Sequence, residues 1–220
     1  MSGTVSGKRD KLAQARLYGI ADLGYLEEAA LEDSVAALLE GGVDLIQLRA
    51  KNVAEGRILA FAQRIAPLCK AAGVPLIIND LVSVARQSEA DGVHLGQADG
   101  QLSSAWSALG HGAIVGRSTH SVLQARTALR QGADYIGFGP LFPTPTKEGR
   151  PGIGLRDIAQ VEEEIGSRIP LFCIGGIKLE NLAQVLEAGA RRVVIVSGLL
   201  QAADIAERCR KVRAILAAGD

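Results

Sequence analysis

This chain of 220 residues has few cysteines, few aromatic residues and no excess of charge of either sign. Its three cysteines, Cys69, Cys173 and Cys209, lie far apart among apolar neighbours, which is typical of reduced core residues in a cytoplasmic protein. Aromatic residues make up 4% of the chain, and 24 basic residues balance 24 acidic ones, so we expect no nucleic-acid partner. No apolar run reaches the roughly 18 residues of a membrane helix, and no signal peptide is visible, so we expect no membrane partner.

Apolar residues, by contrast, are plentiful at 48%, enough for one large buried core. Short apolar runs with strand character lie at Leu17–Ala21, Leu45–Leu48, Leu76–Ile78, Gly92–Leu95, Ile114–Gly116, Tyr135–Phe138, Leu171–Ile174 and Val193–Val196. Helical patterns fill the intervals at Glu27–Glu40, Ala54–Ala72, Val82–Glu89, Leu102–Leu109, Val122–Arg130, Leu155–Ile165, Leu179–Glu187 and Ala202–Leu216. Eight strands, each followed by a helix, predict an α/β fold: a single-domain (β/α)₈ TIM barrel over residues 17–220.

Residues 1–16 are polar and are predicted to form an N-terminal tail or a short helix. A doubly wound open sheet is the competing architecture for the remainder. It would favour a glycine-rich fingerprint after the first strand, but Ala21-Asp22-Leu23 stands there. The barrel is therefore the better interpretation.

The polar residues are distributed unevenly between the two ends of the predicted strands. In TIM barrels the chemistry takes place on the loops that follow the strands. Those loops carry Asp22, Gln47–Lys51, Asn79-Asp80, Gly96–Asp99, Arg117–His120, Gly139–Lys147, Gly175-Gly176 and Ser197-Gly198. The segments before the strands hold mostly small and turn-forming residues. This asymmetry predicts a functional site at the carboxyl-terminal rim.

Within that rim, several groups are suited to anions or to a metal. Gln47, Arg49 and Lys51 alternate along an extended segment, so their side chains share one face and suit a polyphosphate on a polar ring; a salt-bridged surface patch is the alternative. Asp80 and Asp99 follow neighbouring strands, and two carboxylates with phosphate oxygens are a usual Mg²⁺ site. Each of them alone is more often a helix N-cap.

A second anion site is predicted from glycines and hydroxyls. Gly175-Gly176 and Val196–Gly198 follow the last two strands, where TIM barrels often bind a phosphate through backbone N–H groups. The stiff, proline-rich segment Gly139–Lys147 offers two threonine hydroxyls and one ammonium group, although a solvated surface loop is the plainer interpretation. His94, in the middle of a strand, is interpreted as a packed, hydrogen-bonded histidine, and His120 is placed on the rim beside Ser118.

These same residues resemble the thiamine phosphate synthase family over nearly the whole chain. The shared motifs are QLRAK at Gln47–Lys51, ND at Asn79-Asp80, ADGVHLGQAD at Ala90–Asp99, STH at Ser118–His120, GADYIGFGPLFPTPTK at Gly132–Lys147, IGGI at Ile174–Ile177 and VSG at Val196–Gly198. The resemblance implies an enzyme that joins hydroxymethylpyrimidine diphosphate to thiazole phosphate, forming thiamine phosphate and releasing pyrophosphate. It also implies a dissociative, Mg²⁺-assisted mechanism without a general base.

The resemblance also implies roles for individual residues. The pyrimidine diphosphate contacts would be Gln47, Arg49, Lys51, Asn79, Ser118 and Lys147, of which Ser118 and Lys147 would also be catalytic. The thiazole phosphate contacts would be Thr144, Pro145, Thr146, Gly176, Val196 and Ser197. Asp80 and Asp99 would be the Mg²⁺ ligands.

Three positions depart from the family pattern. Ala50 and Ala98 stand where the family usually has glutamate, and Leu81 stands where a polar residue is common. Two other functions stay open: a paralogue that tautomerises the thiazole on the same barrel, and a non-catalytic sensor of phosphorylated ligands. The oligomeric state is also open, with a homo-oligomer as one alternative, as is the choice between a carboxylated and a decarboxylated thiazole.

Overall fold

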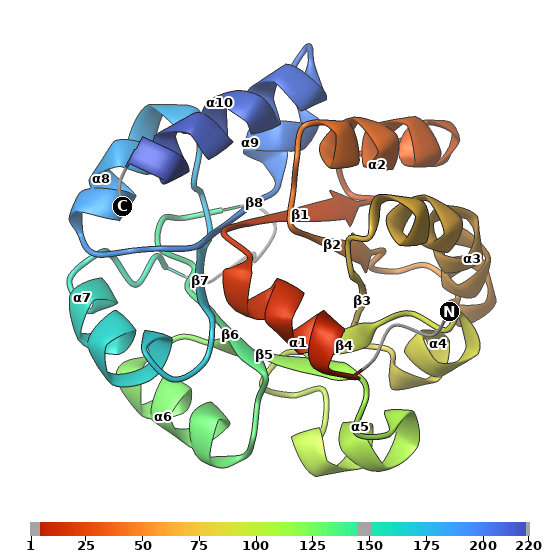
Figure 1. Cartoon of the computed structure of the whole chain (residues 1–220), viewed down its shortest axis with the longest axis horizontal. Helices are drawn as coiled ribbons and strands as arrows, with labels where there is room; N and C mark the ends of the chain where they lie inside the picture. Colours follow the sequence, from red (N-terminus) through yellow and green to blue (C-terminus); the bar gives the residue numbers. More distant parts are fainter. Residues whose placement is uncertain (1–4, 145–150, 219–220) are drawn as a thin grey trace.

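The computed structural model describes residues 5–144 and 151–218, and the strands form a closed, all-parallel barrel in the order β1 to β8 (Figure 1). They are β1 Leu17–Asp22, β2 Leu45–Arg49, β3 Leu76–Asn79, β4 Gly92–Leu95, β5 Ile114–Thr119, β6 Tyr135–Phe138, β7 Leu171–Ile174 and β8 Val193–Ile195. The predicted TIM barrel is therefore confirmed, with β5 extending beyond its predicted end at Gly116.

Helices connect the strands. They are α1 Val5–Gln14, α2 Leu31–Glu40, α3 Glu55–Ala72, α4 Val82–Gln87, α5 Leu102–Leu109, α6 Val122–Arg130, α7 Ile158–Val161, α8 Leu182–Glu187, α9 Ser197–Leu200 and α10 Ile205–Ala218. Short 3₁₀ turns at Glu28–Ala30 and Leu179–Asn181 precede α2 and α8, and a π-helical turn at Glu162–Gly166 continues α7. The predicted start of α7 at Leu155 is wrong, because the N–H of Ile158 closes a turn onto the carbonyl of Leu155. Within the described residues, no helix has both the length and the apolar character that a membrane crossing requires.

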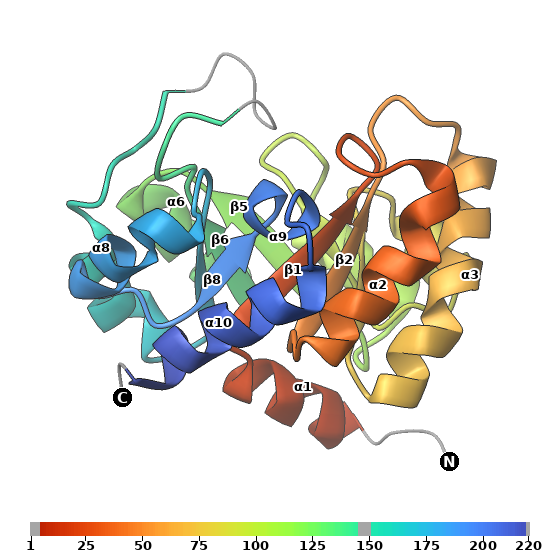
Figure 2. The ribbon, with the colours of Figure 1, turned by 90° about the horizontal axis from the view of Figure 1, so that it is seen from above.

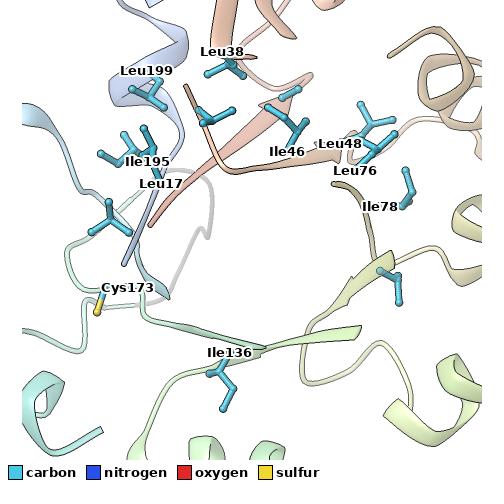
Figure 3. Close-up of a cluster of buried hydrophobic side chains, with 14 of the residues drawn as sticks. Leu17, Leu38, Ile46, Leu48, Leu76, Ile78, Ile136, Cys173, Ile195 and Leu199 are labelled. Atoms are coloured by element: carbon cyan, nitrogen blue, oxygen red, sulfur yellow. The ribbon is translucent and has the colours of Figure 1, made fainter. Parts of the chain in front are cut away.

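The alternation of side chains along each strand creates two cores. One set of strand residues faces outward and packs against the helices, including Leu17, Ile46, Leu48, Leu76, Ile78, Ile136 and Ile195 (Figure 3). The other set fills the barrel and includes Tyr18, Leu45, Ile77, Ile114, Tyr135 and Phe172. Since side chains alternate with a period of two, neighbouring residues belong to different cores. The inward set supplies the floor of any site at the carboxyl-terminal rim.

Helix α1 lies across the amino-terminal end of the barrel, away from the loops that follow the strands (Figure 2). Its Leu12, together with Ala15, is buried against the inner core. Lys8 pairs with Asp91 at 2.8 Å, just before β4. Of the two forms predicted for residues 1–16, the described part is thus a helix that covers this end of the barrel.

Aspartates mark the same end of the barrel. Asp44, Asp91 and Asp134 immediately precede β2, β4 and β6. Each carboxylate accepts a hydrogen bond of 2.8–2.9 Å from a backbone N–H at the start of the neighbouring odd-numbered strand, β1, β3 or β5. These aspartates therefore have a structural role, and the carboxyl-terminal end is left for chemistry.

Candidate active site

A pocket opens at the carboxyl-terminal end of the barrel. The predicted site residues that line it are Gln47, Arg49, Asn79, Ser118, Thr144, Gly176, Val196 and Ser197. They come from both halves of the barrel, between β2 and the start of α9. Pro145, Thr146 and Lys147, also predicted as ligand contacts, lie outside the described residues. The structure thus brings eight of the predicted residues to one cavity, although which ligand each would touch stays a prediction.

The remaining predicted residues lie beside this pocket. Lys51 forms an ion pair with the carboxylate of Asp80, and the side-chain amide of Asn79 donates to the same carboxylate oxygen at 2.7 Å. Asp99 accepts a hydrogen bond from the backbone N–H of Gly96 at 2.7 Å. The side chains of Asp80 and Asp99 are close enough for each to shift the pKa of the other. The two carboxyl groups are therefore adjacent, as a shared metal site requires.

Electrostatics set the Asp80–Asp99 pair apart from ordinary surface carboxylates. Burial raises the pKa of Asp80, and the neighbouring Asp99 raises it further, against the opposing effect of Lys51. Burial also opposes ionisation of Asp99, but the hydrogen bonds from Asp80 and from the Gly96 N–H outweigh it, so the pKa of Asp99 is lowered. The two carboxyl groups are therefore shifted in opposite directions, as expected for neighbouring groups of like charge.

This donor set fits a hard divalent cation. Oxygen ligands at a pair of adjacent carboxylates suit Mg²⁺, which usually keeps several waters and binds substrate phosphates as well. In the part of the chain that the structure describes, no cluster of three or more histidine, cysteine, aspartate or glutamate side chains could hold a metal. Asp80 and Asp99 would therefore supply only part of the coordination, and phosphate oxygens and water the rest.

A cation also lies in the wall of the pocket. Arg49, on β2, forms an ion pair of 2.7 Å with Asp22, whose side chain is 1% exposed. The second oxygen of Asp22 accepts the backbone N–H of Gly24 at 3.0 Å. Asp22 therefore fixes the guanidinium group toward the pocket, where Arg49 can meet an anionic ligand. The sequence placed Asp22 on the rim without assigning it this function.

The wall of the pocket that faces Arg49 is formed by backbone atoms at glycine residues. Gly175 and Gly176 follow β7 with φ angles of +102° and +67°, in or near the left-handed region that favours glycine. A Cβ atom at Gly176 would lie 2.7 Å from the Cβ of Phe142, so a side chain there would displace the loop after β6. Ser197, the first residue of α9, lines the same region. This wall allows a ligand to approach the backbone closely.

The floor of the pocket is a polar chain that the sequence did not predict. The Gln47 amide donates to the hydroxyl of Tyr18 at 2.6 Å, and the hydroxyls of Tyr18 and Tyr135 are 2.9 Å apart. Nδ1 of His94 lies 2.9 Å from the Tyr135 hydroxyl, and its Nε2 lies 2.9 Å from Oγ of Ser118. Burial raises the pKa of both tyrosines, so they stay protonated.

His94 and His120 both lie where the sequence placed them, His94 within β4 and His120 directly after β5. His94 is packed and hydrogen-bonded as predicted, but it also lines the pocket. His120 is not among the residues that line the pocket. Its Nδ1 contacts the carbonyl oxygen of Gly139, and its backbone N–H donates to Gln124 at 2.8 Å. His120 thus links the end of β5 to Gly139, the first residue after β6, and to α6.

Comparisons with known proteins agree with this geometry. A family model described as thiamine monophosphate synthase matches residues 17–199. A thiamine-phosphate synthase of Halalkalibacterium halodurans is 42% identical over 202 residues, covering 91% of this chain and 95% of that protein. One from Thermus thermophilus is 44% identical over 190 residues, covering 86% of this chain and 90% of that protein.

A solved structure is similar as well. Thiamine phosphate pyrophosphorylase from Pyrococcus furiosus superposes with a TM-score of 0.84 at 31% identity, covering 96% of this chain and 98% of the other. The similarity therefore extends over the barrel and the segments that carry the pocket. On the sequence match and the shared fold, the chain belongs to the thiamine monophosphate synthase family.

Proposed function

We propose that this protein is a transferase that condenses 4-amino-2-methyl-5-hydroxymethylpyrimidine diphosphate with 4-methyl-5-(2-phosphooxyethyl)thiazole, or its carboxylated form. The products would be thiamine phosphate and pyrophosphate. Family membership supports this reaction. The structural observation that carries it is a single pocket between a cationic, carboxylate-bearing rim and a glycine-lined wall. We infer that the two phosphorylated substrates bind side by side between these walls.

The two substrates would occupy different walls. The pyrimidine diphosphate would contact Gln47, Arg49, Lys51, Asn79 and Ser118, where the described cations and amides gather. The thiazole phosphate would contact Thr144, Gly176, Val196 and Ser197, where backbone can approach its phosphate. Pro145 and Thr146 are proposed for the thiazole phosphate as well, and Lys147 for the diphosphate, on the family motif alone.

The chemistry needs no general base. The electron-rich aminopyrimidine would expel pyrophosphate: the exocyclic C–O bond breaks, and its electron pair leaves with the phosphate oxygen. The thiazole nitrogen then donates its lone pair to the resulting cationic carbon. Asp80 and Asp99 would hold Mg²⁺, which when bound neutralises charge on the diphosphate. Arg49 and Lys51 would stabilise the same developing charge, and the pocket walls would hold the nucleophile in line.

Cysteine chemistry supports a cytoplasmic location for this activity. The three cysteines are buried and free. Burial raises the pKa of Cys69 and Cys209 to about 12, which keeps these thiols protonated and unreactive. A protein with such thiols and no disulfide among its described residues fits a reducing compartment.

An assay of pyrophosphate release tests the proposal. We expect release only when both substrates and Mg²⁺ are present, with thiamine phosphate identified by mass spectrometry. A sensor would bind the substrates without releasing pyrophosphate, and a tautomerase would isomerise the thiazole without consuming the pyrimidine. Either of those results would contradict the proposed reaction.

A further inference from the structure

We propose that the hydrogen-bonded chain beneath the pocket, through Tyr18, Tyr135 and His94, fixes Ser118 as a hydrogen-bond donor toward the ligand. The three residues would be positioning residues that act through Ser118. The inference rests on the proposed function for its ligand, because Ser118 is assigned there to the pyrimidine. The direction of the hydrogen bonds, however, can be measured on the protein alone.

The hydrogen-bonded chain crosses the barrel and links Gln47 to Ser118, which both line the pocket. Its members come from five strands: Gln47 from β2, Tyr18 from β1, Tyr135 from β6, His94 from β4 and Ser118 from β5. The first four are each less than one-tenth exposed, and the tyrosines are 1% exposed. Because water cannot readily substitute for a partner at this depth, each donor needs an acceptor inside the chain.

Gly116 leaves the space that the ring of Tyr135 occupies. Gly116 lies beside Tyr135 in the register of β5 and β6. A Cβ atom at Gly116 would overlap the ring of Tyr135. The rings of Tyr18, Tyr135 and Phe172 pack edge to face, with centroids 5.4–5.8 Å apart. The phenol groups are therefore held by packing as well as by hydrogen bonds, which limits other orientations.

The direction of the chain follows from counting protons. Gln47 donates its amide hydrogen to the oxygen of Tyr18, so the single hydroxyl proton of Tyr18 is directed to Tyr135. Tyr135 in turn donates to Nδ1 of His94. A neutral imidazole that accepts at Nδ1 carries its hydrogen on Nε2. That hydrogen is donated to Oγ of Ser118, whose own proton is then available to the pocket.

The opposite direction is less favourable while Gln47 donates. The oxygen of Tyr18 would then accept hydrogen bonds from both Gln47 and Tyr135. Its own proton would have no acceptor among these partners, and a buried donor without an acceptor is costly. Ionisation of a tyrosine would relieve this conflict, but burial raises the pKa of both phenols. The amide of Gln47 therefore sets the direction of every bond that follows.

A donor at Ser118 selects one kind of ring. The ring nitrogens of a 4-aminopyrimidine are both acceptors, and N3 of the ring would lie at Ser118. The 4-oxo analogue carries an N–H at N3 and keeps an acceptor only at N1. Two donors would then face each other. A site that forms a hydrogen bond with a substrate discriminates strongly against an analogue that cannot form it. The hydrogen-bonded chain would thus favour an aminopyrimidine over an oxopyrimidine.

The first experiment measures the tautomer of His94 by long-range ¹H–¹⁵N NMR at pH 8 in the ligand-free protein. The protein has three histidines, and the spectrum of His94→Gln identifies which signal belongs to His94. We expect the Nε2–H tautomer in the wild type. Gln47→Glu places an acceptor in place of the donor, so it should reverse the chain and give the Nδ1–H tautomer. Gln184→Glu, which makes the same chemical change at an exposed position of α8 outside the pocket, is the control and should leave the tautomer unchanged.

The second experiment measures competition by two unphosphorylated pyrimidine alcohols, the 4-amino compound and its 4-oxo analogue. In Tyr135→Phe the preference for the amino compound should fall at least about fivefold, because the hydrogen bond to Nδ1 is lost. Thr119→Val is the matched control: it removes a buried hydroxyl that bonds to the carbonyl of Gly137 at 3.1 Å, and it should leave the preference unchanged.

Three results would overturn the inference: an Nδ1–H tautomer in the wild type, a folded Gln47→Glu protein that keeps the wild-type tautomer, or an unchanged preference in Tyr135→Phe. If Gln47→Glu does not fold, the inference is tested by the wild-type tautomer of His94 and by the substrate preference of Tyr135→Phe. Failure of the proposed reaction would appear separately, as absence of pyrophosphate release with a normal His94 tautomer.

Discussion

Replacing Asp99 with asparagine would keep the shape of the side chain and remove one negative charge beside Asp80. The amide oxygen can still accept the Gly96 N–H that Asp99 binds at 2.7 Å, so the loop should keep its conformation. What is lost is one of two charged ligands proposed for Mg²⁺. Asp80→Asn makes the equivalent change on the other carboxyl group, which pairs with Lys51.

The expected loss of turnover follows from the energy of one interaction with a charged ligand. An interaction with a charged group contributes about 1.5–3 kcal/mol. Charge grows on the departing pyrophosphate, so this contribution is larger in the transition state than in the bound substrate. We therefore expect turnover to fall at least about a hundredfold in either variant, equivalent to about 2.7 kcal/mol. Excess Mg²⁺ should partly restore the less affected variant.

Stability should respond differently from turnover. Burial and the neighbouring Asp99 raise the pKa of Asp80, so its ionised form disfavours the folded state when no cation is bound. In EDTA, Asp80→Asn should therefore unfold at the same temperature as the wild type or a higher one. Asp33→Asn, an exposed change on α2, is the control for an ordinary lost carboxylate.

Three measurements check this reasoning: turnover against Mg²⁺ concentration, Mg²⁺ binding by calorimetry, and melting temperature in EDTA. Normal turnover in both variants, or a wild-type rate that EDTA does not change, would refute the metal site. Unfolding of both variants at ordinary temperature would show instead that Asp80 and Asp99 are structural.

Three further predictions follow from individual residues. Gly176→Ala should raise the KM for thiazole phosphate and leave the pyrimidine KM within about twofold, because a Cβ there would displace Phe142; an equal change in both would contradict the assignment. Cys69 and Cys209, whose pKa burial raises to about 12, should resist alkylation at pH 8 until the protein is unfolded; rapid labelling of the native protein would count against this. Burial raises the pKa of Glu162, so its stabilising contribution is present below the unfolded pKa near 4.5 and is lost as pH rises. The melting temperature of Glu162→Gln relative to wild type should therefore be higher at pH 8 than at pH 5, and an equal difference at both would refute the argument.

The strands could be predicted because they are buried on both faces. Their apolar residues face either helices or the barrel interior, so runs such as Tyr135–Phe138 and Leu171–Ile174 appear continuous in the sequence. Helix ends were harder to predict. α9 begins at Ser197 in a segment whose serine and glycine suggest a loop, and α7 begins at Ile158 because a turn at Leu155 delays it. Local propensity does not contain these tertiary constraints.

The candidate site divides in a similar way. Side chains such as Arg49 and Asp80 could be predicted because polar residues after strands are conspicuous. Tyr18 and Tyr135 could not, because a tyrosine within an apolar strand resembles any other core aromatic residue. The available clue was chemical: a buried phenol needs a hydrogen-bond partner, and Gln47 on β2 and His94 on β4 were inward-facing polar candidates. Their pairing depends on the closure of the barrel, which brings the hydroxyls of Tyr18 on β1 and Tyr135 on β6 to 2.9 Å from each other across the interior.

The departures from the family pattern, Ala50 and Ala98 among them, lie outside the lining of the pocket. Ala50 is 9% exposed and packs in the outer core, and neither Ala50 nor Ala98 is among the residues that line the pocket. The loop that carries Ala98 and Asp99 is held from below by Arg117, which donates to the carbonyls of Gly96 at 2.6 Å and Gly100 at 2.8 Å. Backbone contacts at both ends of the loop therefore position Asp99, whatever side chain precedes it. Since Asp80 keeps its own contacts with Lys51 and Asn79, we expect the metal site to tolerate alanine at both departures.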